Sequence, residues 1–155
     1  GVSQPYVFAI KYGDGPLCDS DGETFCRRFG ALGLDLDLGF GVSDQVEVSF
    51  STVLGLSEDD AASATPLLFG LGVRAYSSPE SMVKLYFGGR AILDITSSDA
   101  PQWKTVDIGA RGEIGLALDF IRYLGMYAQL GVTLKFLRGL YFVPDLSAGL
   151  QVRFP

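Results

Sequence analysis

The segment GLDLDLGFG at residues 33–41 alternates between apolar residues and polar or small ones without interruption. Three leucines and Phe40 occupy one parity, while Asp35 and Asp37 occupy the other. A period of two predicts a β-strand, in which successive side chains point to opposite faces. In a soluble sandwich the leucines would face a core and the aspartates would face water. The opposite arrangement has the leucines outside and the aspartates inside, and the polarity of the other segments decides between the two.

The same alternation recurs along the chain, and eight segments with this pattern are each followed by turn or loop residues. On these segments one parity is apolar almost throughout, with Thr52, Gly89 and Gly112 as its exceptions. The connections mostly alternate between short and long, which places the long loops at one end of an antiparallel meander. The predicted strands cover residues 5–12, 29–42, 45–56, 66–76, 82–95, 104–120, 125–137 and 141–154.

The opposite parity carries seven acidic and seven basic residues, interleaved with glycine and serine. A soluble sandwich or a lipocalin-like barrel with a wet charged surface is one interpretation. Glycine weakens a solvated strand surface, however, whereas it makes room for long side chains inside a narrow barrel. Equal numbers of opposite charges also suit pairing in a confined space. The pattern therefore favours an inverted barrel with a lumen charge network made of Lys11, Asp35, Asp37, Glu47, Arg74, Lys84, Arg90, Asp94, Asp107, Arg111, Glu113, Asp119, Lys135 and Arg153.

Aromatic residues gather near the ends of the predicted strands, as expected for girdles at two membrane interfaces. The girdle at one end is predicted to contain Tyr6, Phe8, Phe40, Phe120, Tyr123 and Phe154. The girdle at the other end is predicted to contain Tyr12, Trp103, Phe136, Tyr141 and Phe142.

The length of 155 residues predicts a single domain, residues 1–155. No run reaches the roughly 18 apolar residues of a membrane-spanning helix. The net charge of −6 argues against a nucleic-acid partner.

The whole chain resembles the small eight-stranded outer-membrane barrels, the OmpA transmembrane-domain and OmpX-like class. Its terminal LSAGLQVRFP is similar to their C-terminal assembly signal, with Phe154 as the penultimate residue. The expected fold is all-β, an eight-stranded antiparallel up-and-down transmembrane barrel with a polar, charge-paired interior, closed because an open sheet edge cannot lie in hydrocarbon. We expect it in a Gram-negative outer membrane, with periplasmic termini and extracellular long loops, in contact with outer-membrane lipid and lipopolysaccharide.

The two cysteines, Cys18 and Cys26, lie in one predicted loop with seven residues between them. The spacing suits a loop disulfide in an oxidising compartment, and two free thiols are the alternative. A metal site is not expected, because two thiolates alone do not hold zinc and the sequence contains no histidine. The acidic segment 19–23 lacks the remaining ligands of a calcium loop.

Catalytic chemistry is not indicated either. The absence of histidine excludes a serine–histidine mechanism, and the basic residues of the same parity favour structural roles for Asp35 and Asp37. No enzyme activity and no cofactor are expected. The predicted function is that of a structural anchor or a scaffold that binds surface or envelope proteins through its loops, as a monomer or as a subunit of a larger complex. The alternative is a narrow pore for ions or small solutes.

Overall fold

The computed structural model describes residues 1–10, 25–56, 64–65, 67–78, 80–95, 97–98, 106–121, 124–137 and 140–154. A search of these residues found no helix that is long and apolar enough to cross a membrane. Their strands are β1 (Val2–Ile10), β2 (Phe25–Phe29), β3 (Gly33–Gly41), β4 (Val46–Gly55), β5 (Ala64–Thr65), β6 (Leu67–Tyr76), β7 (Val83–Ile95), β8 (Ser97–Ser98), β9 (Val106–Ile121), β10 (Leu124–Lys135) and β11 (Leu140–Phe154).

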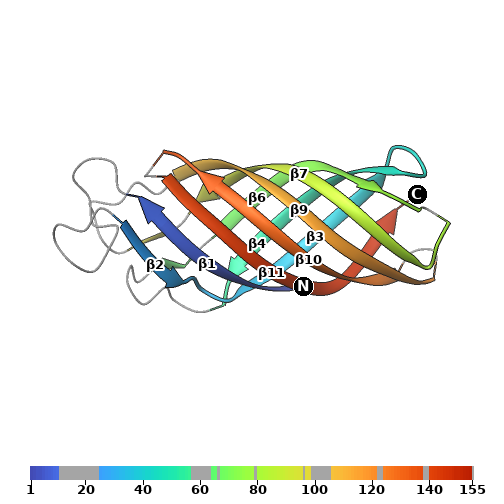
Figure 1. The fold of residues 1–155 in the computed structure, drawn as a ribbon, viewed down its shortest axis with the longest axis horizontal. Coiled ribbons are helices and arrows are strands. Elements are labelled where there is room, and N and C mark those ends of the chain that lie inside the picture. The colour runs from blue at the N-terminus through green and yellow to red at the C-terminus, as the bar shows by residue number, and fades with distance from the viewer. Residues whose placement is uncertain are drawn as a thin grey trace.

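Eight of these strands form a closed antiparallel barrel (Figure 1). In the order β3, β4, β6, β7, β9, β10, β11 each strand pairs with the one that follows it, and β1 closes the ring between β11 and β3. The short strands β5 and β8 pair with each other outside this ring. The predicted all-β, eight-stranded up-and-down barrel is therefore confirmed.

The polarity of the barrel is inverted relative to a soluble protein. Leu36 and Leu38 are 53% and 45% exposed on the outer wall, whereas the side chain of Asp37 between them is only 7% exposed. The same alternation appears along β10, where exposed and buried residues follow one another almost without exception. The leucines of the opening segment therefore lie on the outside, and the interpretation as a soluble barrel with a charged exterior is wrong.

The region predicted as one strand over residues 29–42 is two strands, β2 and β3. Tyr6 of β1 pairs with Phe29, whereas Ser3 pairs with Gly33. Three residues, 30–32, thus stand opposite two on β1, which makes a β-bulge. The bulge lies opposite Pro5, which has no N–H to continue the ladder, and the N–H of Gly30 donates to the carbonyl oxygen of Pro5 at 3.0 Å.

The strand pairing between β11 and β3 differs between the two halves of the barrel. Over one half of the barrel β1 lies between these two strands. Beyond the start of β1, residues Val152–Phe154 pair directly, and in parallel, with residues Leu38–Phe40. The amino group of Gly1 donates to the carbonyl oxygen of Asp35 at 2.5 Å, so the first residue is fixed in the wall. Figure 1 accordingly shows the N-terminus part-way along the barrel and the C-terminus near one end.

The structure groups the aromatic residues differently from the prediction, which placed Tyr6 and Phe8 at the end opposite to Phe142. Phe8 pairs with Phe142 across β1 and β11, and their ring centroids are 6.0 Å apart. Tyr6 lies 4.9 Å from Phe29 by the same measure. Because β1 begins pairing at Val2 and runs toward the long loops, Tyr6 and Phe8 lie at the loop end, and their prediction for the other girdle is wrong.

Candidate functional site

The lumen contains a network of ion pairs centred on Glu113 of β9. Its side chain is completely buried, and its Oε1 accepts from Nε of Arg74 and from Nη2 of Arg90, both at 2.7 Å. Its Oε2 accepts from Nε of Arg111 at 3.3 Å. Three guanidinium groups from three strands therefore converge on one carboxylate. These charges are removed from water, so each of them is stabilised only by the opposite charges that contact it.

Arg74 and Arg90 also hold Asp37 on the opposite side of the barrel. Arg74 bonds to Asp37 through Nη2, and Nη2 of Arg90 lies 2.8 Å from the same Oδ2. Arg74 also reaches Glu47, which is its register partner on β4, at 3.3 Å. These contacts link β3, β4, β6, β7 and β9 through side chains across the lumen. The guanidinium fork makes this possible because it offers several donors in one plane.

Arg111 forms a second centre with Asp145 of β11. Its Nη2 donates to Oδ1 of Asp145 at 2.8 Å, and its Nη1 donates to Oδ2, which is bidentate pairing. Gly131 makes room for this group, because a Cβ atom there would lie 2.2 Å from Nη2 of Arg111. This is the role that the sequence predicts for glycine on the charged parity.

Asp145 is absent from the predicted set of acidic lumen residues, which was therefore short by one. Pro144 interrupts the strand pattern just before it, although Pro144 pairs with Val132 within the sheet. The signal that could have found Asp145 is its parity, which it shares with Ser147 and Gln151, both buried.

Each end of the lumen has its own pair. Lys84 lies 2.7 Å from Asp119 near the short turns, and Lys135 lies 2.6 Å from Asp94 near the loop end. Asp107, directly opposite Asp94 on the neighbouring strand, accepts from the N–H of Ile108 at 2.9 Å and from that of Leu137 at 2.8 Å. It therefore ties the chain that follows β10 to β9.

Some predicted residues are not placed. Of the two aromatic girdles, Tyr12, Trp103 and Tyr123 lie outside the described residues, and the side chain of Phe154 is not described. Lys11 and Cys18 lie outside the described residues, and the side chains of Cys26 and Arg153 are not described. The Cys18–Cys26 disulfide stays a prediction. Labelling of free thiols in the unreduced, unfolded protein checks it, and two reactive thiols would contradict it.

Tyrosines fill the lumen beside the charges, and these inward-facing rings are not among the residues predicted from the sequence. The hydroxyl of Tyr76 donates to Glu47 at 2.7 Å, and that of Tyr86 donates to Gln129 at 2.6 Å. The Tyr86 ring lies 5.2 Å from the Arg74 guanidinium carbon, within the range of a cation–π contact. Their inward parity, together with a hydroxyl that needs a partner when buried, was the available signal.

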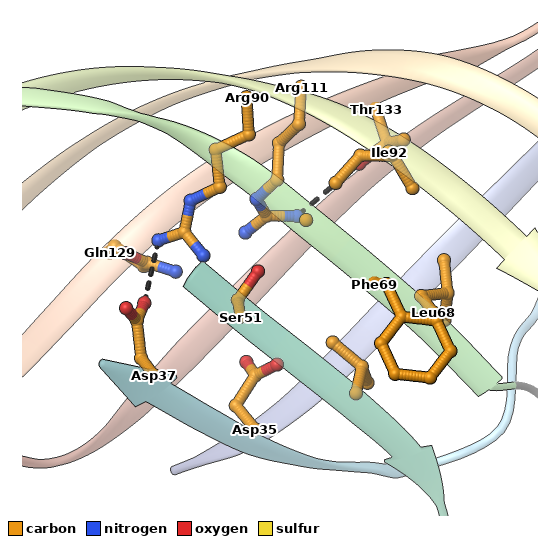
Figure 2. A pocket seen from close by; sticks show the side chains of 12 residues that line it. Asp35, Asp37, Ser51, Leu68, Phe69, Arg90, Ile92, Arg111, Gln129 and Thr133 are labelled. Atoms are coloured by element: carbon orange, nitrogen blue, oxygen red, sulfur yellow. Dashed lines mark hydrogen bonds and ion pairs between the residues drawn. The ribbon is translucent and has the colours of Figure 1, made fainter. Parts of the chain in front are cut away.

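A cavity of roughly 40 Å³ remains among the charged groups (Figure 2). Its polar lining includes Asp35, Asp37, Arg90, Arg111 and Gln129. A space of this size holds one or two water molecules. The carboxylate of Asp35 makes no hydrogen bond or ion pair to another described side chain, and water in this cavity is its natural partner.

The described lumen residues offer little for catalysis. Among them, no group of three or more potential metal ligands lies together. Asp37 is held by two arginines, and the histidine that a hydrolytic triad needs is absent from the sequence. The arrangement is suited to holding strands together.

No protein-family model and no curated protein matches the sequence. The structure is similar to the crystal structure of Neisserial surface protein A (NspA), with a TM-score of 0.64 and 16% sequence identity. The match covers 99% of this chain and 96% of that one. The chain has the fold of the small eight-stranded outer-membrane barrels. At this identity the likeness to NspA shows the fold, which agrees with the class that the sequence resembles.

Proposed function

We propose that this chain is a non-enzymatic outer-membrane barrel that presents binding residues at its loop end on a rigid, closed scaffold. The observation that carries the proposal is the inverted polarity, with apolar side chains along the outer wall and paired charges inside. An apolar outer band and a polar interior are the physical requirement for a barrel in a bilayer. Closure of the ring satisfies the backbone groups that hydrocarbon cannot.

The proposed orientation places the long connections outside the cell and the termini in the periplasm. Bacterial outer-membrane barrels have short periplasmic turns and longer extracellular loops. Here β3–β4 and β6–β7 are joined by short turns at one end, while residues 11–24 and 96–105 connect strands at the other. An epitope inserted after residue 60 should be labelled on intact cells, and the same epitope inserted between residues 43 and 44 should not. The reverse pattern would contradict this orientation.

The scaffold is proposed to be closed to ions. Eight strands leave an interior that side chains can fill, and Arg74, Arg90 and Arg111 cross it with their partners. Reconstituted into planar bilayers, the protein should give no steady single-channel current. A large and steady current would favour the alternative function, a narrow pore.

Binding to an envelope or surface protein is proposed to involve the connection between β1 and β2. Crosslinking in native membranes tests this with a variant in which residues 13–24 are replaced by a Gly-Ser linker. A matched control replaces residues 43–45, in the short β3–β4 turn, in the same way. Loss of partners with the first variant alone supports the proposal, and identical partner sets in both variants and the wild type contradict it.

A further inference from the structure

The charged side chain of Arg27, on β2, lies on the outside of the barrel. Arg27 is exposed, and among the strand residues whose side chains the structure describes it is the only exposed charged one. It stands on β2 opposite Phe8 of β1, whose side chain also points outward. The other charged strand side chains of this set face the lumen, so Arg27 departs from the rule that governs the rest of the wall.

The β-bulge at residues 30–32 sets this outward direction. On β3 the even-numbered residues, such as Leu36 and Leu38, are exposed. On β2 the odd-numbered Phe25 and Phe29 are exposed instead, because the extra residue of the bulge reverses the parity. Without the bulge, Arg27 would share the parity of Asp35 and would face the lumen. The exposed side chain of Gln4 donates to the carbonyl oxygen of Gly30 at 3.1 Å, which holds the bulge against β1.

Aromatic rings surround Arg27 on the same outer face. Phe25 and Phe29, its neighbours of the same parity, are 53% and 73% exposed. The Phe25 ring stacks at 6.5 Å on Phe8, and Phe8 in turn contacts Phe142 on β11. We call this group the arginine–aromatic patch; it consists of Tyr6, Phe8, Phe25, Arg27, Phe29 and Phe142. It lies at the loop end, where Figure 1 shows β2 beside β1.

The residue types of the patch indicate how deep it lies in the bilayer and which kind of ligand it binds. An arginine on the lipid face costs about 2–4 kcal/mol at the bilayer midplane but only about 0–1 kcal/mol near an interface. Aromatic residues are enriched at that interface level. A guanidinium there meets lipid headgroups, and its planar fork pairs with phosphate in a bidentate manner. In the proposed orientation, the leaflet at the loop end is the outer one.

We propose that the arginine–aromatic patch binds a lipopolysaccharide molecule, with Arg27 pairing to a phosphate of its lipid A and the rings contacting its acyl chains. This deepens the proposed function and rests on the outer-membrane orientation given there. Phospholipid phosphate carries related chemistry, and it is an outcome of the test rather than the ligand proposed.

Native mass spectrometry of the purified barrel in detergent micelles tests the proposal with defined lipids. The probes are diphosphoryl lipid A, the same lipid without its phosphates, and phosphatidylglycerol. The wild type should retain diphosphoryl lipid A in preference to both others. Arg27→Gln should weaken that binding about tenfold, the scale of one lost charge-assisted contact, and Arg27→Lys should weaken it less because it keeps the charge.

A pair of aromatic variants separates the patch from a general effect of the apolar wall. Phe29→Leu lies in the patch and should weaken binding of lipid A, whereas Phe40→Leu makes the same change at the short-turn end and should not. Equal binding by wild type and Arg27→Gln would overturn the proposal, as would equal retention of phosphatidylglycerol. If Arg27→Gln does not fold, Arg27→Lys decides: unchanged affinity for diphosphoryl lipid A relative to its dephosphorylated form contradicts the bidentate pairing.

The result can be separated from the proposed function. If the wild type inserts into bilayers with its loops exposed but shows no preference for lipid A, then the proposed binding of lipid A by the arginine–aromatic patch is refuted. The proposed scaffold function is not affected by that result. Failure to insert refutes both.

Discussion

Arg111 and Asp145 form the most complete pair of the lumen, with two parallel contacts between β9 and β11. We expect Arg111→Leu to lower the free energy of unfolding by about 3–5 kcal/mol, because it leaves Asp145 buried without its cation. The double variant Arg111→Leu/Asp145→Leu should recover much of that loss, since no unpaired charge remains at either position. Urea unfolding in lipid vesicles, followed by tryptophan fluorescence, measures both values. A double variant less stable than the single one would contradict this account.

Glycines on the two faces of the wall have opposite roles. Gly89 and Gly112 face each other across β7 and β9, and a Cβ atom at either would meet nothing within 4 Å. A Cβ atom at Gly72 would lie 2.1 Å from the carbonyl oxygen of Gly89. Alanine at residue 89 or 112 should therefore stabilise the barrel by about 0.4–1 kcal/mol through the unfolded state, while Gly72→Ala should destabilise it. The same unfolding assay checks the signs, and loss of stability with Gly89→Ala would reveal an unrecognised need for glycine there.

At the scale of elements, Asp107 connects the end of β10 to β9 through the N–H of Leu137. Asp107→Ala removes the acceptor of two backbone donors and should cost about 1–3 kcal/mol. Asp107→Asn keeps an acceptor oxygen and should cost less. Hydrogen exchange at Leu137 measures the local effect, with faster exchange expected in the alanine variant. Unchanged exchange in that variant would show that Asp107 does not hold this segment.

The strands were largely predictable from sequence, because the apolar outer wall has few exceptions to its alternation. The bulge at residues 30–32 was not predictable, because it depends on how β2 and β3 register against Pro5. The same limit applied to Tyr6 and Phe8, which lie at the loop end only because β1 begins pairing with β11 at Val2. Alternation gives the face of a residue but not its height along the barrel.

The sequence predicted that charged residues line the lumen, but it did not predict which of them pair. Parity identified Arg74, Arg90 and Glu113 as inward-facing, whereas their convergence depends on the relative shift of β6, β7 and β9. Asp145 was missed because a proline interrupts its pattern. For the arginine–aromatic patch the sequence had no signal, since Arg27 faces outward only through the bulge.

At the scale of the whole molecule, the proposed function requires that the apolar outer wall faces lipid hydrocarbon. Leu71 of β6 is 60% exposed on that wall, and Asp44 lies in the short turn after β3. A tryptophan placed at each position in turn, in a Trp103→Phe background, reports its surroundings through quenching by phospholipids with brominated acyl chains.

We expect blue-shifted emission and strong quenching for Leu71→Trp, with red-shifted and weakly quenched emission for Asp44→Trp. Water-exposed emission from Leu71→Trp in a folded protein that stays monomeric without detergent would contradict this expectation.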